Sequence, residues 1–146
     1  MAESRELDRD HCADLLRSGV IGRAALTTPS GPHIVPVNYS VVDDEIIIRT
    51  APYSMLGTYG PGSLVAFEVD CIDYQRHLGW SVLARGRAHQ VTDPDAVMKV
   101  NDRWPPRPWA DGPRSLLIRL PWDELSGVRL GRGWTSHNEM PVRRTV

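Results

Sequence analysis

Runs in which β-branched and other apolar residues alternate with polar ones recur along the chain, and this pattern is typical of strands. The predicted strands cover residues 21–27, 33–42, 45–50, 63–69, 79–91 and 115–120. The turn-forming pairs Ser30-Gly31 and Asp43-Asp44 separate the first three runs, which predicts consecutive hairpins.

Apolar residues take helical spacing in two places. The first helix is predicted to begin after Asp8, a good N-terminal cap, and to end at Gly19 in the left-handed conformation. The second begins at Asp93-Pro94 and ends before the proline-rich segment 104–109. The apolar faces of the two helices hold Cys12, Leu15, Leu16, Ala96, Val97 and Val100.

Strands that outnumber helices, with short connections between them, predict a mainly β fold. The expected architecture is a small antiparallel β-barrel with helices at its openings. The length of 146 residues fits a single domain over residues 1–146. Within it we expect a core over about 7–127 and a C-terminal tail over 128–146.

Composition excludes several classes of partner. A formal net charge of −1 gives no electrostatic reason to expect nucleic acid or an anionic membrane surface. No window approaches the roughly 20 apolar residues of a membrane span, and the N-terminus lacks a signal-peptide core. Only two cysteines occur, with no CxxC pair, so neither a disulfide framework nor a zinc knuckle is indicated. We therefore expect a cytoplasmic protein with reduced thiols.

The common catalytic motifs are absent from the sequence, which has no GxSxG elbow, no GxxxxGK[ST] loop and no HExxH pair. The histidines lie singly and, with two distant cysteines, assemble no metal site by spacing. No side chain stands out as a general acid or base. Tyr39 and His33 are the candidates, and no catalytic residue is assigned.

The segment after the strand 45–50 carries the most specific candidate chemistry. Arg49, Thr50 and Ser54 place a guanidinium and two hydroxyls within a few residues, which are the donors that a phosphate needs. A short helix predicted to start near Ser54 would add unpaired backbone N–H groups, although Gly57 and Pro61 limit it to a turn or two. The alternative is an ordinary strand end with a capping hydroxyl.

Two other segments could face a flat ligand. Pro36 removes a ladder donor and belongs at a sheet edge, where the amides of Val35 and Val37 could bind a hydrogen-bonding ring. Trp80 and Ser81 are adjacent in a strand and therefore point to opposite faces. Core packing is the alternative explanation for the tryptophan. Trp104 and Trp109, in the proline-rich segment, are stiff aromatic surfaces that could likewise either face a flat ligand or serve packing.

Taken in order, these segments resemble the pyridoxamine 5′-phosphate oxidase-like superfamily of FMN-binding split barrels. The branch they resemble is that of small bacterial flavin- or deazaflavin-dependent oxidoreductases, which includes the nitroimidazole-resistance proteins. The resemblance covers about residues 7–127. Its carriers are the segments 15–23, 34–39, 48–50, 65–70 and 79–87, and the later residues Pro108, Trp109, Gly112 and Arg114.

The resemblance implies a six-stranded split β-barrel that forms a homodimer, with two flavin sites at the subunit interface. By position, the residues that line the isoalloxazine ring are Val35, Pro36, Val37 and Asn38. Arg49 and Thr50 match ribityl and phosphate contacts, and Ser54 and Met55 lie in the phosphate loop. Trp80 and Ser81 reach the flavin from a neighbouring strand, and the substrate-side residues are Tyr39, Trp109 and Arg114.

Met55 departs from the family pattern, because close relatives carry lysine or arginine directly after the phosphate-loop serine. A charged hydrogen bond to phosphate is worth about 1.5–3 kcal/mol. Its loss would weaken FMN binding by roughly ten- to a hundredfold. Arg49, Arg76 and Arg85 are the cations that could compensate.

The function that the resemblance implies is that of an FMN-dependent oxidoreductase. Hydride would pass through the flavin N5 between a nicotinamide donor and a small organic substrate. Two alternatives stay open at this point. One replaces FMN with the deazaflavin F420, and the other is a flavin-free barrel that binds or converts an aromatic or haem-like ligand.

Overall fold

The structure is a computed structural model that describes residues 4–103, 109 and 114–133. The strands are β1 (Ser4–Glu6), β2 (Ile21–Thr28), β3 (Gly31–Asn38), β4 (Ser40–Val42), β5 (Glu45–Thr50), β6 (Leu64–Asp73), β7 (Leu78–Arg87), β8 (His89–Gln90), β9 (Leu116–Pro121) and β10 (Glu124–Leu130). The helices are α1 (Arg9–Ser18), α2 (Met55–Tyr59) and α3 (Pro94–Arg103).

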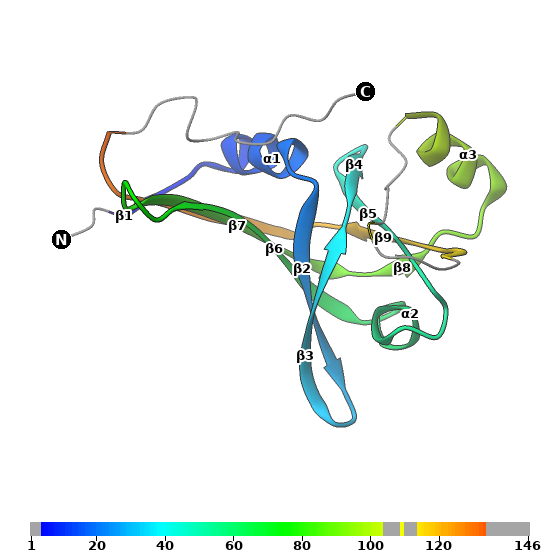
Figure 1. The fold of residues 1–146 in the computed structure, drawn as a ribbon. Coiled ribbons are helices and arrows are strands. Elements are labelled where there is room, and N and C mark those ends of the chain that lie inside the picture. Colours follow the sequence, from blue (N-terminus) through cyan, green and yellow to red (C-terminus); the bar gives the residue numbers. More distant parts are fainter. Residues whose placement is uncertain (1–3, 104–108, 110–113, 134–146) are drawn as a thin grey trace.

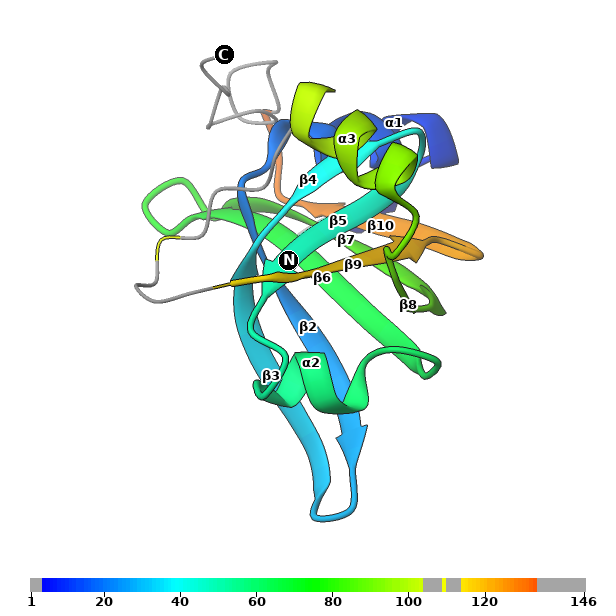
Figure 2. The same ribbon diagram turned by 90° about the vertical axis from the view of Figure 1, so that its right-hand side faces the viewer.

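The strands form two antiparallel sheets, as Figure 1 shows. A six-stranded sheet has the order β1-β10-β7-β6-β2-β3, and a four-stranded sheet has the order β4-β5-β9-β8. The main core lies between the inner faces of the sheets and α1. A smaller cluster holds α3 against the four-stranded sheet, and Figure 2 shows this helix above β5 and β9. The mainly β, antiparallel fold predicted from the sequence is confirmed.

The predicted strand 33–42 divides at Tyr39 into β3 and β4, which belong to different sheets. The Tyr39 N–H donates to the carbonyl of Val20, and its side chain turns into the core, so the chain leaves one sheet here and enters the other. The predicted strand 79–91 divides in the same way into β7 and β8. Between these strands Ala88 is buried, and its N–H donates to the Ser63 carbonyl.

The sequence patterns missed β1 and β10, which pair with each other and extend the six-stranded sheet. β10 continues to Leu130, three residues into the stretch assigned to the tail. Gly127 interrupts the apolar pattern of β10 for a packing reason. A Cβ there would lie 2.8 Å from the Sγ of Cys12, so a glycine lets α1 pack closely.

Both long helices begin where the sequence predicted. The Asp8 carboxylate accepts from the His11 N–H at 2.8 Å and caps α1, and α3 begins at Pro94. The prediction that Gly19 adopts the left-handed conformation is wrong, because its φ is −81°. Glycine is required here for space, since a Cβ would collide with the Tyr39 hydroxyl. The predicted Asp43-Asp44 turn is confirmed, and both residues have positive φ, as a tight two-residue hairpin requires.

Candidate functional site

The open edge of β3 is the first element of the candidate site. β3 ends the six-stranded sheet and pairs only with β2, so one side of its backbone has no strand partner among the described residues. Pro36 lies in this strand, which confirms its predicted place at a sheet edge. The β2–β3 hairpin projects away from the rest of the barrel in Figure 1.

The hydrogen-bond phase of β3 follows from the bond between the Tyr39 N–H and the Val20 carbonyl, 3.0 Å long. In an antiparallel pair, bonded and non-bonded residue pairs alternate. With the observed register, the backbone groups of Val35 and Val37 therefore turn toward β2, and those of Pro36 and Asn38 turn toward the open edge.

This phase corrects one prediction: the amides of Val35 and Val37 cannot serve a ligand, because β2 uses them. The groups that face the open edge are instead the N–H of Ile34 and Asn38 and the carbonyls of Ile34, Pro36 and Asn38. Both prolines of β3, Pro32 and Pro36, stand at positions whose nitrogen points to this edge, so neither costs a ladder bond.

The side chain of Asn38 connects the end of β3 to Trp109. Its Oδ1 accepts from the Trp109 N–H at 2.8 Å, and its Nδ2 donates to the Val20 carbonyl at 3.4 Å. The Trp109 side chain is 69% exposed. The structure thus brings together Asn38, predicted to line the flavin ring, and Trp109, predicted to lie at the substrate mouth.

Tyr39 lies in the core and not at the open edge. Its hydroxyl donates to the Leu16 carbonyl, and its ring meets Phe67 edge-on with centroids 5.0 Å apart. This burial does not support the predicted substrate contact, and the observed role of Tyr39 is to fix the crossing between the sheets. The other acid–base candidate, His33, lies near the tip of the β2–β3 hairpin with its Nε2 3.3 Å from the Ser30 hydroxyl.

The corner between β5 and α2 is the second element. The hydroxyls of Thr50 and Ser54 lie 2.8 Å apart, as their spacing suggested. The Ser54 Oγ donates to the Ala51 carbonyl and accepts from the Gly57 N–H, so it caps α2. Because its single proton goes to Ala51, the shared bond must take its proton from Thr50. Neither hydroxyl then has a proton left for a phosphate unless this network rearranges.

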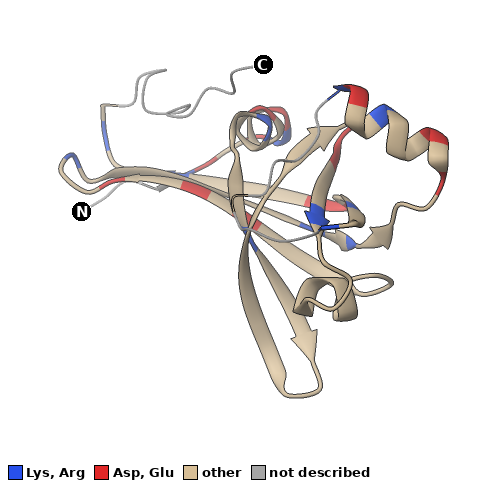
Figure 3. Cartoon of the chain, turned by 45° about the vertical axis from the view of Figure 1, so that its right-hand side comes forward, with Lys and Arg blue, Asp and Glu red and all other residues tan. Residues whose placement is uncertain are grey.

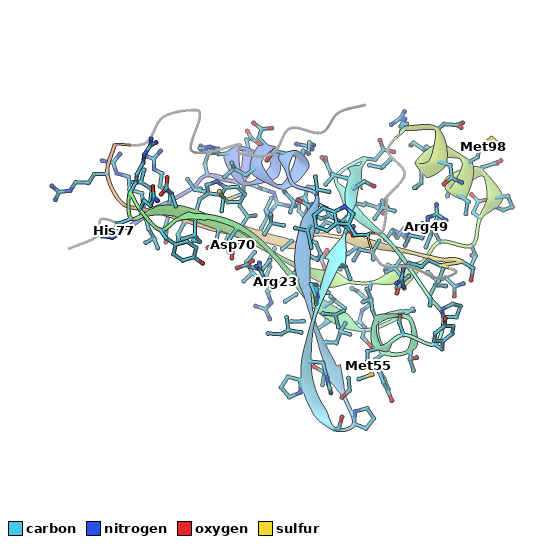
Figure 4. All side chains as sticks on the ribbon, viewed as in Figure 1. Arg23, Arg49, Met55, Asp70, His77 and Met98 are labelled. Carbon is cyan, nitrogen blue, oxygen red and sulfur yellow. The ribbon has the colours of Figure 1, made fainter. Side chains whose placement is uncertain are left out.

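Arg49 is separated from the two hydroxyls by the alternation of the strand. Thr50 points into the barrel and Arg49 points to the opposite face, where its Nη2 donates to the Oδ1 of Asn101 on α3 at 2.8 Å. Figure 4 shows Arg49 between the four-stranded sheet and α3, and Met55 extending from α2. Met55 is 36% exposed, and α2 contains no charged residue.

The two distant cations that could have compensated for Met55 do not reach this corner. Arg76 lies in the β6–β7 turn beside Asp73, and Arg85 pairs with Glu124 at 3.2 Å. Arg87, which was not among the cations predicted to compensate for Met55, donates to the carbonyl of Gly62 just after α2. Arg23 is the one charged residue of β2 and β3. Figure 3 shows α2 and most of the β2–β3 hairpin without charge colours.

Trp80 and Ser81 do not converge with β3 within one chain, because β6 and β2 lie between β7 and β3. Three strand spacings correspond to about 14 Å. Trp80 is buried in the main core, and its Nε1 has no hydrogen-bond partner among the described residues. Ser81 lies on the other face of β7. Arg114 follows the proline-rich segment just before β9, and Trp104 lies outside the described residues.

The face of the six-stranded sheet that turns away from the main core, here called the outer face, was not anticipated. It carries many of the exposed large apolar side chains of the described residues, namely Ile21, Ile34, Leu64, Ile72, Leu83 and Leu130. The signal was present in the sequence as strands with apolar residues on both faces, since β2 and β6 each begin with an exposed apolar residue, Ile21 and Leu64, directly before a buried position.

A charged cluster lies in the middle of the outer face. Arg23 Nη1 is 3.0 Å from Glu68 Oε1 and 3.4 Å from Asp70 Oδ2. Burial raises the pKa of the Glu68 carboxyl to about 7, and the neighbouring Asp70 adds to the rise, while Arg23 acts in the opposite direction. Figure 4 labels Arg23 and Asp70 on adjacent parts of the sheet.

Comparison with known proteins gives a family match and close structural neighbours. The sequence model of the pyridoxamine 5′-phosphate oxidase family matches residues 8–129. The uncharacterized protein Rv0080 of Mycobacterium tuberculosis is 33% identical over 130 residues, covering 86% of this chain and 84% of that protein.

Two solved structures share the fold of the chain. The FAD binding protein from Mycobacterium smegmatis is 28% identical, with a TM-score of 0.73 over 85% of this chain and 96% of that chain. A protein from Bacteroides thetaiotaomicron, named as a candidate 5-nitroimidazole antibiotic resistance protein, shares the fold at 14% identity. Its TM-score is 0.68, over 89% of each chain. None of the described helices is long and apolar enough to cross a membrane.

Proposed function

The chain belongs to the pyridoxamine 5′-phosphate oxidase family, and from this premise we propose that it binds a flavin and uses it in an oxidation–reduction reaction on a small organic molecule. The neighbour from M. smegmatis, which the chain matches over most of its length, is a FAD binding protein by name. The proposal needs a place for a flat ring with a polar edge.

The open edge of β3 carries this proposal. It presents backbone donors at Ile34 and Asn38 and backbone acceptors at Ile34, Pro36 and Asn38. A flavin ring has both donors and acceptors along its pyrimidine edge, so a strand edge of this kind matches it without any special side chain. Backbone N–H groups there would also stabilise negative charge on the reduced ring.

The side chains near this edge would position the ligand. The hydrogen bond from the Trp109 N–H to Asn38 places an exposed indole beside the end of β3, where it could stack on a ring. A bound flavin would supply hydride transfer between a nicotinamide nucleotide and the substrate. The residues of the chain would hold the ring, exclude water and shape the substrate mouth.

We take FMN as the cofactor, with FAD and F420 as the alternatives. The open edge of β3 suits the ring of all three cofactors. The corner between β5 and α2 suits a phosphate less well, because Met55 replaces a cation and the Thr50 and Ser54 hydroxyls bond to each other. Arg49 is the cation closest in sequence, and it would have to share its guanidinium between the phosphate and Asn101.

We further propose that the chain acts as a homodimer joined through the outer face. Six of the eleven exposed large apolar side chains of the described residues lie on this one sheet face, and exposed apolar surface of this kind marks protein–protein contact sites. A two-fold dimer would cover this face with itself. It would also bring Ser81 of one chain toward the other chain. Within a single chain, β6 and β2 separate Ser81 on β7 from the open edge of β3.

Absorption spectroscopy of the full-length protein tests the function. We expect a flavin spectrum after reconstitution with FMN, and bleaching of that spectrum by a reduced nicotinamide nucleotide under anaerobic conditions. Parallel titrations with FMN, FAD, F420 and riboflavin identify the cofactor. A protein that binds none of the four at tens of micromolar overturns the proposal. A protein that binds FMN but is never reduced by a nicotinamide nucleotide overturns only the assigned electron donor.

A further inference from the structure

The cluster formed by Arg23, Glu68 and Asp70 lies at the centre of the proposed dimer surface. The register places Pro36, Arg23, Glu68 and Leu83 in one row across β3, β2, β6 and β7. Asp70 and Ser81 occupy the next row. Leu83 stands in the first of these rows and other exposed apolar side chains lie on both sides of them, so a second copy that covers the apolar positions must also cover the charges.

The cluster does not balance its charge when it is fully ionised. It holds one guanidinium against two carboxylates, all three of them partly exposed, with side-chain exposures of 53% for Arg23, 35% for Glu68 and 28% for Asp70. One added proton makes the cluster neutral. Burying an unbalanced charge is costly, whereas a neutral, hydrogen-bonded group can be buried at little cost.

The other described cations on the outer face do not pair with the cluster. Arg85, diagonal to Glu68 on β7, pairs with Glu124 at 3.2 Å. Arg87 stands opposite Leu64, two rows along the face from Glu68, and donates to the Gly62 carbonyl. Leu83 stands directly opposite Glu68 on β7, and β3 contributes Pro36 to the row. On β1, Glu6 is a further negative group on this face, beside Val128 of β10.

We propose that the Arg23–Glu68–Asp70 cluster makes the association of two copies through the outer face proton-linked. Each cluster holds one carboxyl proton, on Glu68, when two chains are joined, and the dimer weakens as that proton leaves. This inference rests on the proposed homodimer and adds to it the condition under which it forms.

The direction of the effect follows from linkage. In the free chain the pKa of Glu68 is already raised to about 7, and covering the face removes more water and raises it further. Below pH 7 both states hold the proton, and association does not depend on pH. Above pH 7 the free chain loses the proton and the dimer keeps it. The dissociation constant then rises by up to about tenfold per pH unit for each cluster, or about a hundredfold for two clusters.

Sedimentation equilibrium of the full chain between pH 7 and 9, at constant ionic strength, measures this slope. We expect the dissociation constant of the wild type to rise at least about tenfold over this range. Glu68→Gln keeps the size and hydrogen bonding of the side chain but cannot ionise, so its constant should stay level and its dimer should persist at pH 9. Asp70→Asn should also flatten the curve. The matched control is Glu124→Gln on the same face, which should keep the wild-type slope.

Several results would overturn the inference. A wild-type dimer whose dissociation constant is unchanged from pH 7 to 9 would do so, as would a Glu68→Gln variant with the wild-type slope. If dissociation is too weak to follow directly, urea unfolding at two protein concentrations reports the same slope. A chain that stays monomeric at every pH contradicts the homodimer itself, and flavin binding by that monomer would leave the flavin proposal standing. The two thiols of the chain do not belong to the proposed dimer surface. Cys12 and Cys71 lie on the inner side of the sheet, and burial raises the pKa of each thiol.

Discussion

The open edge of β3 and the corner between β5 and α2 would hold opposite ends of one flavin, and the chain builds them from different material. The edge of β3 consists of backbone groups, whose direction is set by the register with β2. The corner consists of side chains, and there Met55 stands where the resemblance predicts a cation, while Ser54 caps a five-residue helix.

The difference indicates which part of such a site can change during evolution. A backbone edge survives most substitutions, because every residue except proline supplies the same donor and acceptor. A side-chain site is lost when one residue changes. The two regions should therefore respond differently to mutation.

The largest effect is expected for Val37→Pro. The Val37 N–H turns toward β2, so proline there removes a ladder bond and strains the strand, at a cost of about 3 kcal/mol or more. Pro36→Ala, one residue away, should change the free energy of unfolding by less than about 1 kcal/mol, because the nitrogen of that residue faces the open edge. Urea unfolding of the two variants measures the difference. Equal tolerance of both would show that the phase assigned to β3 is wrong.

An intermediate effect is expected for Met55→Lys. A lysine at the start of α2 would place an ammonium near Thr50 and Ser54, and should tighten FMN binding about ten- to a hundredfold, while riboflavin, which has no phosphate, should bind as before. Fluorescence titration with both ligands measures the ratio. The matched control is Met98→Lys, an equally simple change at an exposed methionine of α3. If FMN affinity does not rise, α2 is not at the phosphate end.

The smallest effect is expected for Tyr39→Phe, which follows directly after β3. The change removes the hydrogen bond to the Leu16 carbonyl and should cost about 1 kcal/mol of unfolding free energy. Flavin affinity and turnover should be unchanged, because the ring packs against Phe67 in the core. Thermal unfolding, a flavin titration and the rate of flavin reduction by a nicotinamide nucleotide check these statements. A large loss of turnover with normal stability would instead support the predicted substrate contact of Tyr39.

Much of the fold could be predicted because its determinants are local. The Asp8 cap, the Asp43-Asp44 turn and the Pro36 edge position each depend on a few neighbouring residues, and each is confirmed. The division of a predicted strand at Tyr39 was missed because it depends on a contact with Val20, far away in the sequence.

The site was less predictable for the same reason. Spacing correctly joined Thr50 to Ser54, but it could not show that their protons are used within the pair. The bond between Arg49 and Asn101 spans 52 residues, and the Arg23–Glu68 pair spans 45, so neither is visible in a local pattern. Register and strand order, which the sequence does not state, bring these groups together.

A paired titration with FMN and riboflavin tests the central claim most directly, namely that the chain keeps the ring end of a flavin site and has weakened the phosphate end. The account predicts that both ligands bind and that FMN binds no more than about tenfold tighter than riboflavin, a difference of about 1.4 kcal/mol. Failure of both ligands to bind would contradict the ring site at β3. FMN binding that exceeds riboflavin binding a thousandfold would contradict the weakened phosphate end.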